Sequence, residues 1–142
     1  MKPTELVRLA KTAMQRAYVP YSGYKVGAAL LTKGGKVYLG CNIENAAFGP
    51  SNCAERTAFF TAIAAGETEF ESIAVVGGKD GVVTDIFPPC GVCRQVMREF
   101  CDPEEFRIIL GAGTGEKQVY LLKELLPLSF GPDNLKGKEK YS

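Results

Sequence analysis

Three cysteines and one glutamate are the residues of this 142-residue sequence whose spacing most clearly suggests chemistry. One residue separates Cys53 from Glu55, and a second group places Cys90 and Cys93 at the C-x-x-C spacing that suits one metal ion or one disulfide. Three thiolates leave one position of a tetrahedral zinc ion open, and a nearby carboxylate can move protons there. The pattern therefore predicts a hydrolytic zinc site whose acid–base group is the glutamate.

The same thiols admit two other interpretations. A structural zinc ion would be closed by a fourth thiolate, for which Cys41 is the nearest candidate in sequence. A redox dithiol would use Cys90 and Cys93 alone, at a spacing superficially like the thioredoxin motif. The first alternative leaves the glutamate without a role and the second leaves the earliest of the three cysteines unexplained, so the spacing favours the catalytic site. Outside a metal site, Cys41 and Cys101 are most simply small buried core residues.

Histidine is absent from the sequence, and its absence restricts the chemistry further. A catalytic triad that depends on histidine and an H-E-x-x-H zinc site are both impossible. Acid–base work near neutral pH must come from a carboxylate, a lysine, a tyrosine or a thiol. Glu55 is the candidate that lies closest in sequence to a predicted ligand.

Composition argues against two classes of partner. The formal net charge is +1 and no run of lysine or arginine compensates for it, so we expect no nucleic-acid partner. The longest apolar stretches fall far short of a membrane span, and the first residues open into an amphipathic pattern rather than a signal peptide, so we expect no membrane partner. Five cysteines in a chain of this size favour a reduced, cytoplasmic protein over a disulfide scaffold.

Apolar periodicity and turn residues predict an alternating order of helices and strands in a single domain, residues 1–142, with a frayed tail at 136–142. Thr4 is the predicted N-cap of the first helix. Both cysteine groups fall at or near helix starts, where the helix dipole favours thiolates. The predicted helices cover 4–18, 53–65 and 91–100, and the predicted strands cover 26–32, 37–42, 70–76, 106–110 and 119–122.

Two glycine-containing segments are predicted to be hairpin turns. Residues 33–36 contain Gly-Gly and join the first two predicted strands. Residues 111–115 have the spacing G-x-G-x-G and precede a strand, which excludes a dinucleotide-binding loop. An apolar segment at 125–132 follows the last predicted strand.

The two cysteine groups, Cys53-Ala54-Glu55 and Pro89-Cys90-Gly91-Val92-Cys93, resemble the signature of zinc deaminases in its three-cysteine form. The segments 20–22, 26–31, 40–46 and 124–132 also resemble cytidine deaminases of the small homotetrameric type, so the similarity covers residues 18–135. The resemblance implies an α/β fold, a three-layer α/β/α domain with a five-stranded mixed sheet whose first two strands form a hairpin. It also implies a homotetramer with shared active sites.

The resemblance assigns roles to individual residues. Cys53, Cys90 and Cys93 would bind Zn²⁺, and Glu55 would shuttle protons from water to N3 of the ring and to the departing amine. Arg56 would offset the negative charge of the thiolates by hydrogen bonding to them. The implied substrate-binding residues are Asn42 and Glu44 at the ribose 3′-hydroxyl, Tyr24 and a neighbouring subunit's Phe130 at the cytosine ring, and Ala54 and Ala46.

The implied activity is zinc-dependent hydrolysis of cytidine and deoxycytidine to uridine, deoxyuridine and ammonia, a reaction of pyrimidine salvage. Two alternatives remain: deamination of a related aminonucleoside, as in blasticidin-type deaminases, and a non-enzymatic zinc-binding module in which Glu55 would be dispensable. Family members often carry tyrosine where this chain has Phe48, so this position lacks a hydroxyl for hydrogen bonding.

Overall fold

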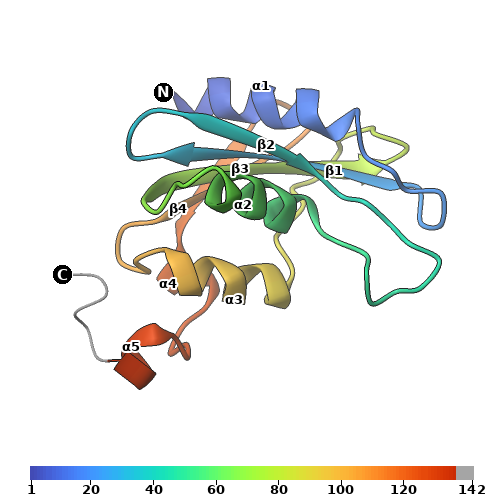
Figure 1. The fold of residues 1–142 in the computed structure, drawn as a ribbon. Coiled ribbons are helices and arrows are strands. Elements are labelled where there is room, and N and C mark those ends of the chain that lie inside the picture. The colour runs from blue at the N-terminus through green and yellow to red at the C-terminus, as the bar shows by residue number, and fades with distance from the viewer. Residues whose placement is uncertain (137–142) are drawn as a thin grey trace.

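A five-stranded mixed sheet with the order β2-β1-β3-β4-β5 forms the middle layer of residues 1–136, the part of the chain that this computed structural model describes (Figure 1). β1 pairs antiparallel with both β2 and β3, β3 pairs parallel with β4, and β4 pairs antiparallel with β5. The predicted hairpins at 33–36 and 111–115 are confirmed as the β1–β2 and β4–β5 connections. The strands are β1 (Tyr24–Thr32), β2 (Val37–Cys41), β3 (Phe70–Lys79), β4 (Arg107–Gly111) and β5 (Lys117–Leu121).

Helices cover both faces of the sheet, which confirms the predicted three-layer α/β/α fold. One helix, α1, lies on one face, and α2 and α3 lie on the other (Figure 1). None of the helices in residues 1–136 is long and apolar enough to span a membrane. The helices are α1 (Pro3–Met14), α2 (Ala54–Ala64), α3 (Gly91–Phe100), α4 (Leu122–Leu125) and α5 (Pro132–Lys136).

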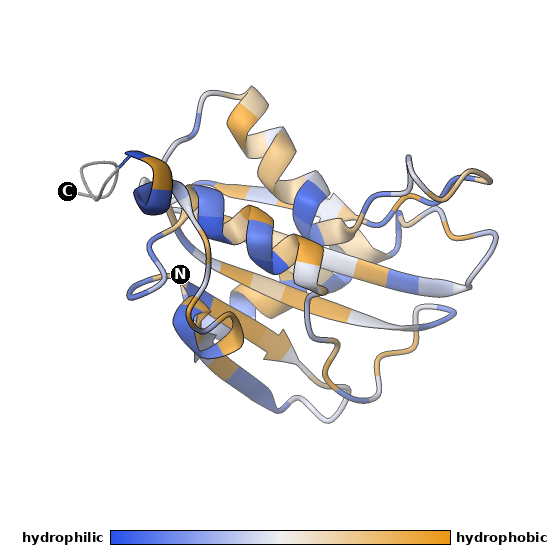
Figure 2. Ribbon diagram, turned by 90° about the horizontal axis from the view of Figure 1, so that it is seen from below, coloured by the Kyte–Doolittle hydropathy of each residue, from blue (hydrophilic) through white to orange (hydrophobic). Residues whose placement is uncertain are grey.

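The central strands bury both of their faces because successive side chains point to opposite sides of a strand. In β3, Ile73 and Val75 join the core under α2 and α3, whereas Ala74 and Val76 join the core under α1. This alternation accounts for the nearly continuous apolar run in the sequence. Figure 2 shows hydrophobic, orange stretches along the strands of the sheet.

Several predicted boundaries are wrong, including that of β1, which starts at Tyr24 rather than at residue 26. The first helix ends at Met14 rather than at residue 18, because Tyr18 forms an isolated β-bridge with Ile43. Lys2, not Thr4, is the N-cap, since proline suits the first helical position that follows it. β3 continues to residue 79, and Lys136, predicted to belong to the tail at 136–142, is the last residue of α5. The rest of that tail lies outside the described residues.

Candidate active site

The N-terminal ends of α2 and α3 bring three sulfur atoms together. Cys53 and Cys90 are the N-cap residues of α2 and α3, and Cys93 lies in the first turn of α3. The Sγ atom of Cys90 is 3.7 Å from that of Cys53 and 3.5 Å from that of Cys93, and all three lie within 4.8 Å of one another. We call these three residues the sulfur cluster.

The geometry of the sulfur cluster fits one zinc ion. Zn–S bonds of about 2.3 Å at tetrahedral angles place two sulfur ligands about 3.8 Å apart, close to the two separations in the cluster. The predicted fourth ligand of a structural site, Cys41, is not part of this group in the described residues. All five cysteines are free thiols. The donor set therefore leaves a fourth position open, as catalytic zinc sites do.

Positive charge next to the sulfur cluster favours its ionised form. A thiol–thiol hydrogen bond from Cys93 lowers the pKa of the Cys53 thiol, and the same bond raises the pKa of the Cys93 thiol. Arg56 Nη2 donates to Cys53 Sγ at 3.2 Å. Arg56 Nε is buried and has no hydrogen-bond partner among the described residues, which leaves a second donor near the sulfurs.

Glu55 lies in the first turn of α2 and is only 4% exposed. Burial is the main cause that raises the pKa of its carboxyl to about 7, and the nearby Cys53 charge adds to the rise. A carboxyl with this pKa both accepts and releases a proton near neutral pH. The start of α2 lies directly on the sheet because residue 40 is glycine: a Cβ there would lie 2.4 Å from the Ala54 carbonyl oxygen.

A cavity of about 190 Å³ opens beside the sulfur cluster. It brings together four predicted site residues besides the cysteines: Tyr24, Asn42, Ala54 and Glu55. Sequence reasoning assigned no role to its other lining residues, although Phe87 lies three positions before a predicted ligand and this proximity was a usable signal. These further lining residues are Ser22, Val26, Phe87 and Pro88.

Glu44 faces an adjoining cavity of about 420 Å³ that shares Ser22 with the first. Its Oε1 accepts from the backbone N–H groups of Tyr21 and Ser22 at 3.0 and 3.1 Å, and its Oε2 accepts from Ser22 Oγ at 2.5 Å. The Ser22 hydroxyl is the main cause that lowers the pKa of this carboxyl. The Asn42 amide bonds the backbone of β1, accepting from Val26 N–H and donating to the Tyr24 carbonyl.

Three further residues from the sequence analysis do not line the first cavity. Phe48 is 87% exposed and lines the adjoining cavity, Phe130 is 60% exposed, and Ala46 lies in the exposed loop that follows Glu44. The aromatic ring that does accompany Tyr24 is that of Phe87, at 6.3 Å between ring centroids.

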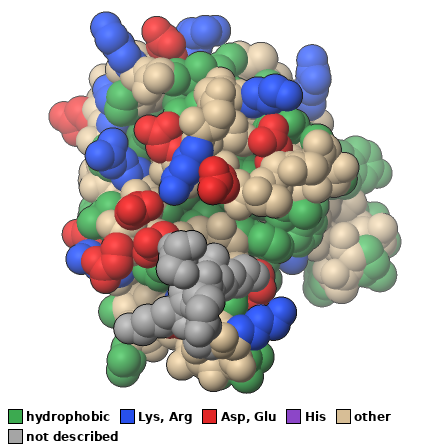
Figure 3. Space-filling view, turned by 60° about the vertical axis from the view of Figure 1, so that its left-hand side comes forward, with side chains coloured by type: hydrophobic (Ala, Val, Ile, Leu, Met, Phe, Trp, Pro, Cys, Tyr) green, Lys and Arg blue, Asp and Glu red, His purple; other side chains and the backbone are tan. Residues whose placement is uncertain are grey.

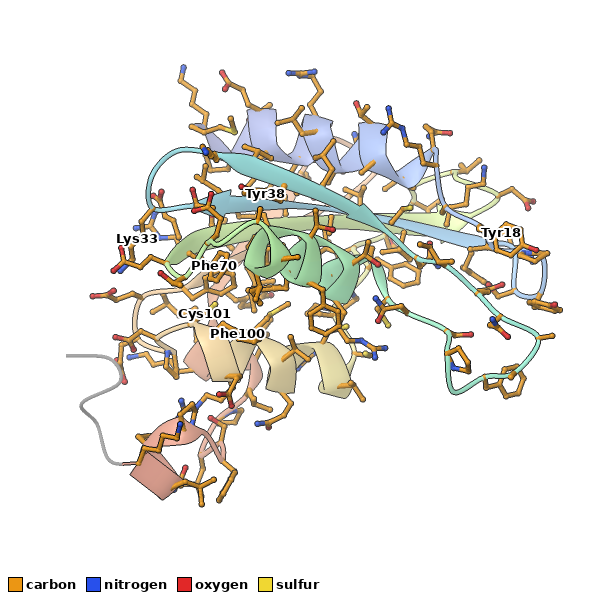
Figure 4. The ribbon with its side chains drawn as sticks, in the orientation of Figure 1. Tyr18, Lys33, Tyr38, Phe70, Phe100 and Cys101 are labelled. Carbon is orange, nitrogen blue, oxygen red and sulfur yellow. The ribbon has the colours of Figure 1, made fainter. Side chains whose placement is uncertain are left out.

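A larger cavity, of about 510 Å³, lies at the C-terminal ends of α2 and α3. Phe100 and Cys101 line it, and Figure 4 labels both at the end of the molecule opposite Tyr18. Figure 3, which turns this side forward, shows acidic side chains in red among basic ones in blue. We call the cavity at the C-terminal ends of α2 and α3 the far cavity. Its charged lining residues are Lys33, Glu67, Glu69, Asp102 and Glu105.

Comparison with known proteins gives one consistent family. The model of the "Cytidine and deoxycytidylate deaminase zinc-binding region" matches residues 1–108. The cytidine deaminase of Sporosarcina psychrophila is 44% identical over 135 residues, which are 95% of this chain and 96% of that protein. The cytidine deaminase of Halalkalibacterium halodurans is 47% identical over 130 residues, covering 92% and 95% of the two chains.

Solved structures agree with the sequence relatives. The crystal structure of cytidine deaminase from Burkholderia pseudomallei has a TM-score of 0.84 and 48% identity, and covers 92% of this chain and 100% of that one. The cytidine deaminase of Mycobacterium tuberculosis has a TM-score of 0.78 at 36% identity, covering 92% and 98%. The predicted family resemblance and fold are thereby confirmed.

Proposed function

This chain belongs to the cytidine deaminase family of hydrolytic enzymes, and we propose that it converts cytidine and water to uridine and ammonia at the sulfur cluster. The observation that carries the proposal is the convergence of three cysteine sulfurs beside a cavity that also holds a buried carboxyl. A redox dithiol would need only two of these sulfurs and no carboxyl. A non-enzymatic zinc module would have no use for the cavity.

The cofactor in this proposal is one zinc ion held by Cys53, Cys90 and Cys93. When bound there, zinc supplies a Lewis acid that makes water a nucleophile near neutral pH. Three thiolates bring more negative charge than the ion's two positive charges, which would weaken it as a Lewis acid. Arg56, which already donates to Cys53 Sγ, offsets part of this excess.

Glu55 is the proton carrier in the proposed reaction. It accepts a proton from the attacking water and delivers it to N3 of the cytosine ring; it then accepts the second proton from the hydroxyl group now attached to C4 and delivers it to the departing amine. These transfers need one carboxyl that takes up and releases a proton twice. Burial of Glu55, which raises its pKa to about 7, suits it to this work.

The residues around the cavity orient the nucleoside in this proposal. Tyr24 offers an aromatic face for the cytosine ring, Ala54 offers its backbone, and Ala46 approaches from the neighbouring loop. Asn42 and Glu44 hold the ribose 3′-hydroxyl, since each has hydrogen-bonding capacity left beyond its contacts within the chain. Cytidine and deoxycytidine share that hydroxyl, so both are proposed substrates.

A homotetramer with shared active sites would complete the substrate slot. Phe130 and Phe48 expose 60% and 87% of their surfaces, and burial of such rings between chains would favour assembly. A neighbouring subunit's Phe130 would then cover the open side of the cavity. Sedimentation of the native protein tests this directly: we expect a species of four chains, and a stable, fully active monomer would contradict it.

We assign the enzyme to pyrimidine salvage in the cytoplasm, a reducing compartment that suits five free thiols. The experiment that tests the activity follows ultraviolet absorbance of cytidine, deoxycytidine and cytosine incubated with the zinc-loaded protein. We expect conversion of both nucleosides but not of the free base, which lacks the ribose. Zinc-loaded, folded protein that converts neither nucleoside would refute the proposed function.

A further inference from the structure

The segment between α4 and α5, residues 126–131, runs beneath α3 in Figure 1 and is held by side chains of that helix. Gln95 Nε2 donates to the Phe130 carbonyl at 2.9 Å. Arg98 is 5% exposed and donates to Ser129 Oγ at 2.8 Å and to Asp133 Oδ1 at 2.5 Å. A helix that provides two sulfurs at its start therefore also orders the C-terminal segment.

Arg94 differs from Gln95 and Arg98 because its guanidinium donates hydrogen bonds to two separate segments of the chain. Its Nη1 donates to the Leu125 carbonyl at 2.7 Å, at the end of α4. Its Nε donates to the Pro89 carbonyl at 2.8 Å, directly before Cys90. One planar group thus connects the turn that carries a sulfur ligand to the C-terminal segment.

The turn before Cys90 has few backbone hydrogen-bond donors that could fix its position. Pro88 and Pro89 have no backbone N–H, so neither can donate a hydrogen bond. Pro89 is buried and its carbonyl needs a donor, which Arg94 provides. Cys90 itself is exposed, whereas Cys93 is completely buried and fixed by packing. Cys90 is therefore the member of the sulfur cluster whose position depends most on its turn.

We propose that Arg94 is a positioning residue that fixes Cys90 for metal binding and couples the metal site to the C-terminal segment. The inference rests on the proposed zinc site. It has two consequences: loss of the double contact weakens zinc binding, and removal of zinc loosens the segment that follows α4. An arginine that only attached this segment to α3 would have neither effect on the metal.

Lysine is the decisive replacement at position 94. Its ammonium keeps the positive charge but is a single point donor, whereas arginine bonds two separate carbonyls with one rigid group. Arg94→Lys therefore retains the charge and breaks the bridge. Arg94→Met removes both the positive charge and the bridge. Gln95→Leu is the matched control, because the Gln95 side chain donates a hydrogen bond to Phe130 in the C-terminal segment and, within the described residues, none to the turn before Cys90.

The experiment measures zinc affinity of folded protein by competition with a chromophoric chelator. We expect binding to weaken about 10- to 100-fold in Arg94→Met, as for residues that orient metal ligands, with a smaller loss in Arg94→Lys and wild-type affinity in Gln95→Leu. Wild-type affinity in both folded position-94 variants would overturn the inference. If Arg94→Met does not fold, Arg94→Lys alone decides, and undiminished affinity there overturns it.

Hydrogen exchange supplies a second readout that does not depend on activity. Zinc removal should accelerate amide exchange at 126–136 in the wild type, and this acceleration should disappear in Arg94→Lys, where the coupling is already broken. Equal acceleration in both proteins would overturn the coupling. Zinc-free wild type that still deaminates cytidine would refute the proposed site itself, whereas active, zinc-binding Arg94 variants with normal affinity would refute only the role of Arg94.

Discussion

The two ends of the α2–α3 pair carry cavities that contrast in size and in content. The cavity at the N-terminal ends measures about 190 Å³ and is lined by two residues of the sulfur cluster, Cys53 and Cys90, and by the buried Glu55. The far cavity measures about 510 Å³, yet within residues 1–136 no second group of three possible metal ligands is found there. The contrast favours placing the proposed chemistry where reactive groups converge rather than in the larger cavity.

The contrast has a physical basis in the helices themselves. Free N–H groups and the positive end of the dipole favour anions at helix N-termini, which is where Cys53 and Cys90 lie. The far cavity lies at the opposite ends, and its acids interact with nearby donors instead: Glu67 accepts from Tyr38 Oη at 2.8 Å, and Glu105 lies 3.5 Å from Lys33 Nζ. These are ordinary surface contacts.

The sharpest test of the comparison removes one buried thiol from each end of α3. Cys93 and Cys101 are both buried, but only Cys93 contacts other sulfurs. We expect Cys93→Ala to lose zinc, activity and the part of its stability that metal binding provides, because metal binding and folding are linked. Cys101→Ala should keep zinc and lose only about 0.5–3 kcal/mol of unfolding free energy, as typical core substitutions do. Metal analysis and thermal unfolding measure both, and full zinc occupancy in Cys93→Ala would remove that residue from the ligand set.

The same comparison applies to the carboxylates. Glu55→Gln should keep zinc and fold but lower kcat by about 10²- to 10⁴-fold or more, since an amide cannot carry the proton. Glu67→Gln at the far cavity is the matched control: its amide oxygen can still accept from Tyr38 Oη, and we expect wild-type kcat. Steady-state deamination of cytidine checks both variants. Wild-type turnover in Glu55→Gln would show that the acid–base assignment is wrong.

A smaller effect is expected from the ribose contacts. A hydrogen bond to a charged group contributes about 1.5–3 kcal/mol, which corresponds to a loss of about 10- to 150-fold in kcat/KM. We expect Glu44→Ala with cytidine, and wild type with 3′-deoxycytidine, to show penalties of this size that do not add when combined. Additive penalties, or none with the 3′-deoxy substrate, would show that Glu44 only shapes its loop.

The smallest expected effect is a pKa change within the adjoining cavity. Because the Ser22 hydroxyl is the main cause that lowers the pKa of Glu44, Ser22→Ala should raise that pKa toward its ordinary value. A lowered pKa stabilises the fold above the unfolded-state pKa, and this contribution disappears as pH falls through the folded-state value. Carboxyl-carbon NMR titration measures the change, and an unaltered pKa would mean that the backbone N–H groups dominate.

The sequence was sufficient to predict the sulfur cluster because its signals are local. The C-x-x-C spacing and the glutamate two residues after Cys53 predict a metal site in any fold that places these residues at helix starts. Phe87 and Ser22 were missed because an aromatic and a serine outside helices and strands have many ordinary roles, and both line the cavity from such segments. The helices α4 and α5 are too short to show a periodic pattern.

The separation of the sulfur ligands along the chain leads us to expect that the sulfur cluster forms late in folding. Cys53 and Cys90 are 37 positions apart, and all of β3, the strand between β1 and β4, lies between them. Closing so long a loop is entropically costly, so the three sulfurs meet only after β3 has paired and α3 has packed. Contacts that form after the folding transition state slow unfolding rather than speed folding. Zinc bound at the proposed site should therefore lengthen the lifetime of the folded chain, so that the proposed catalytic ion would also protect the fold kinetically.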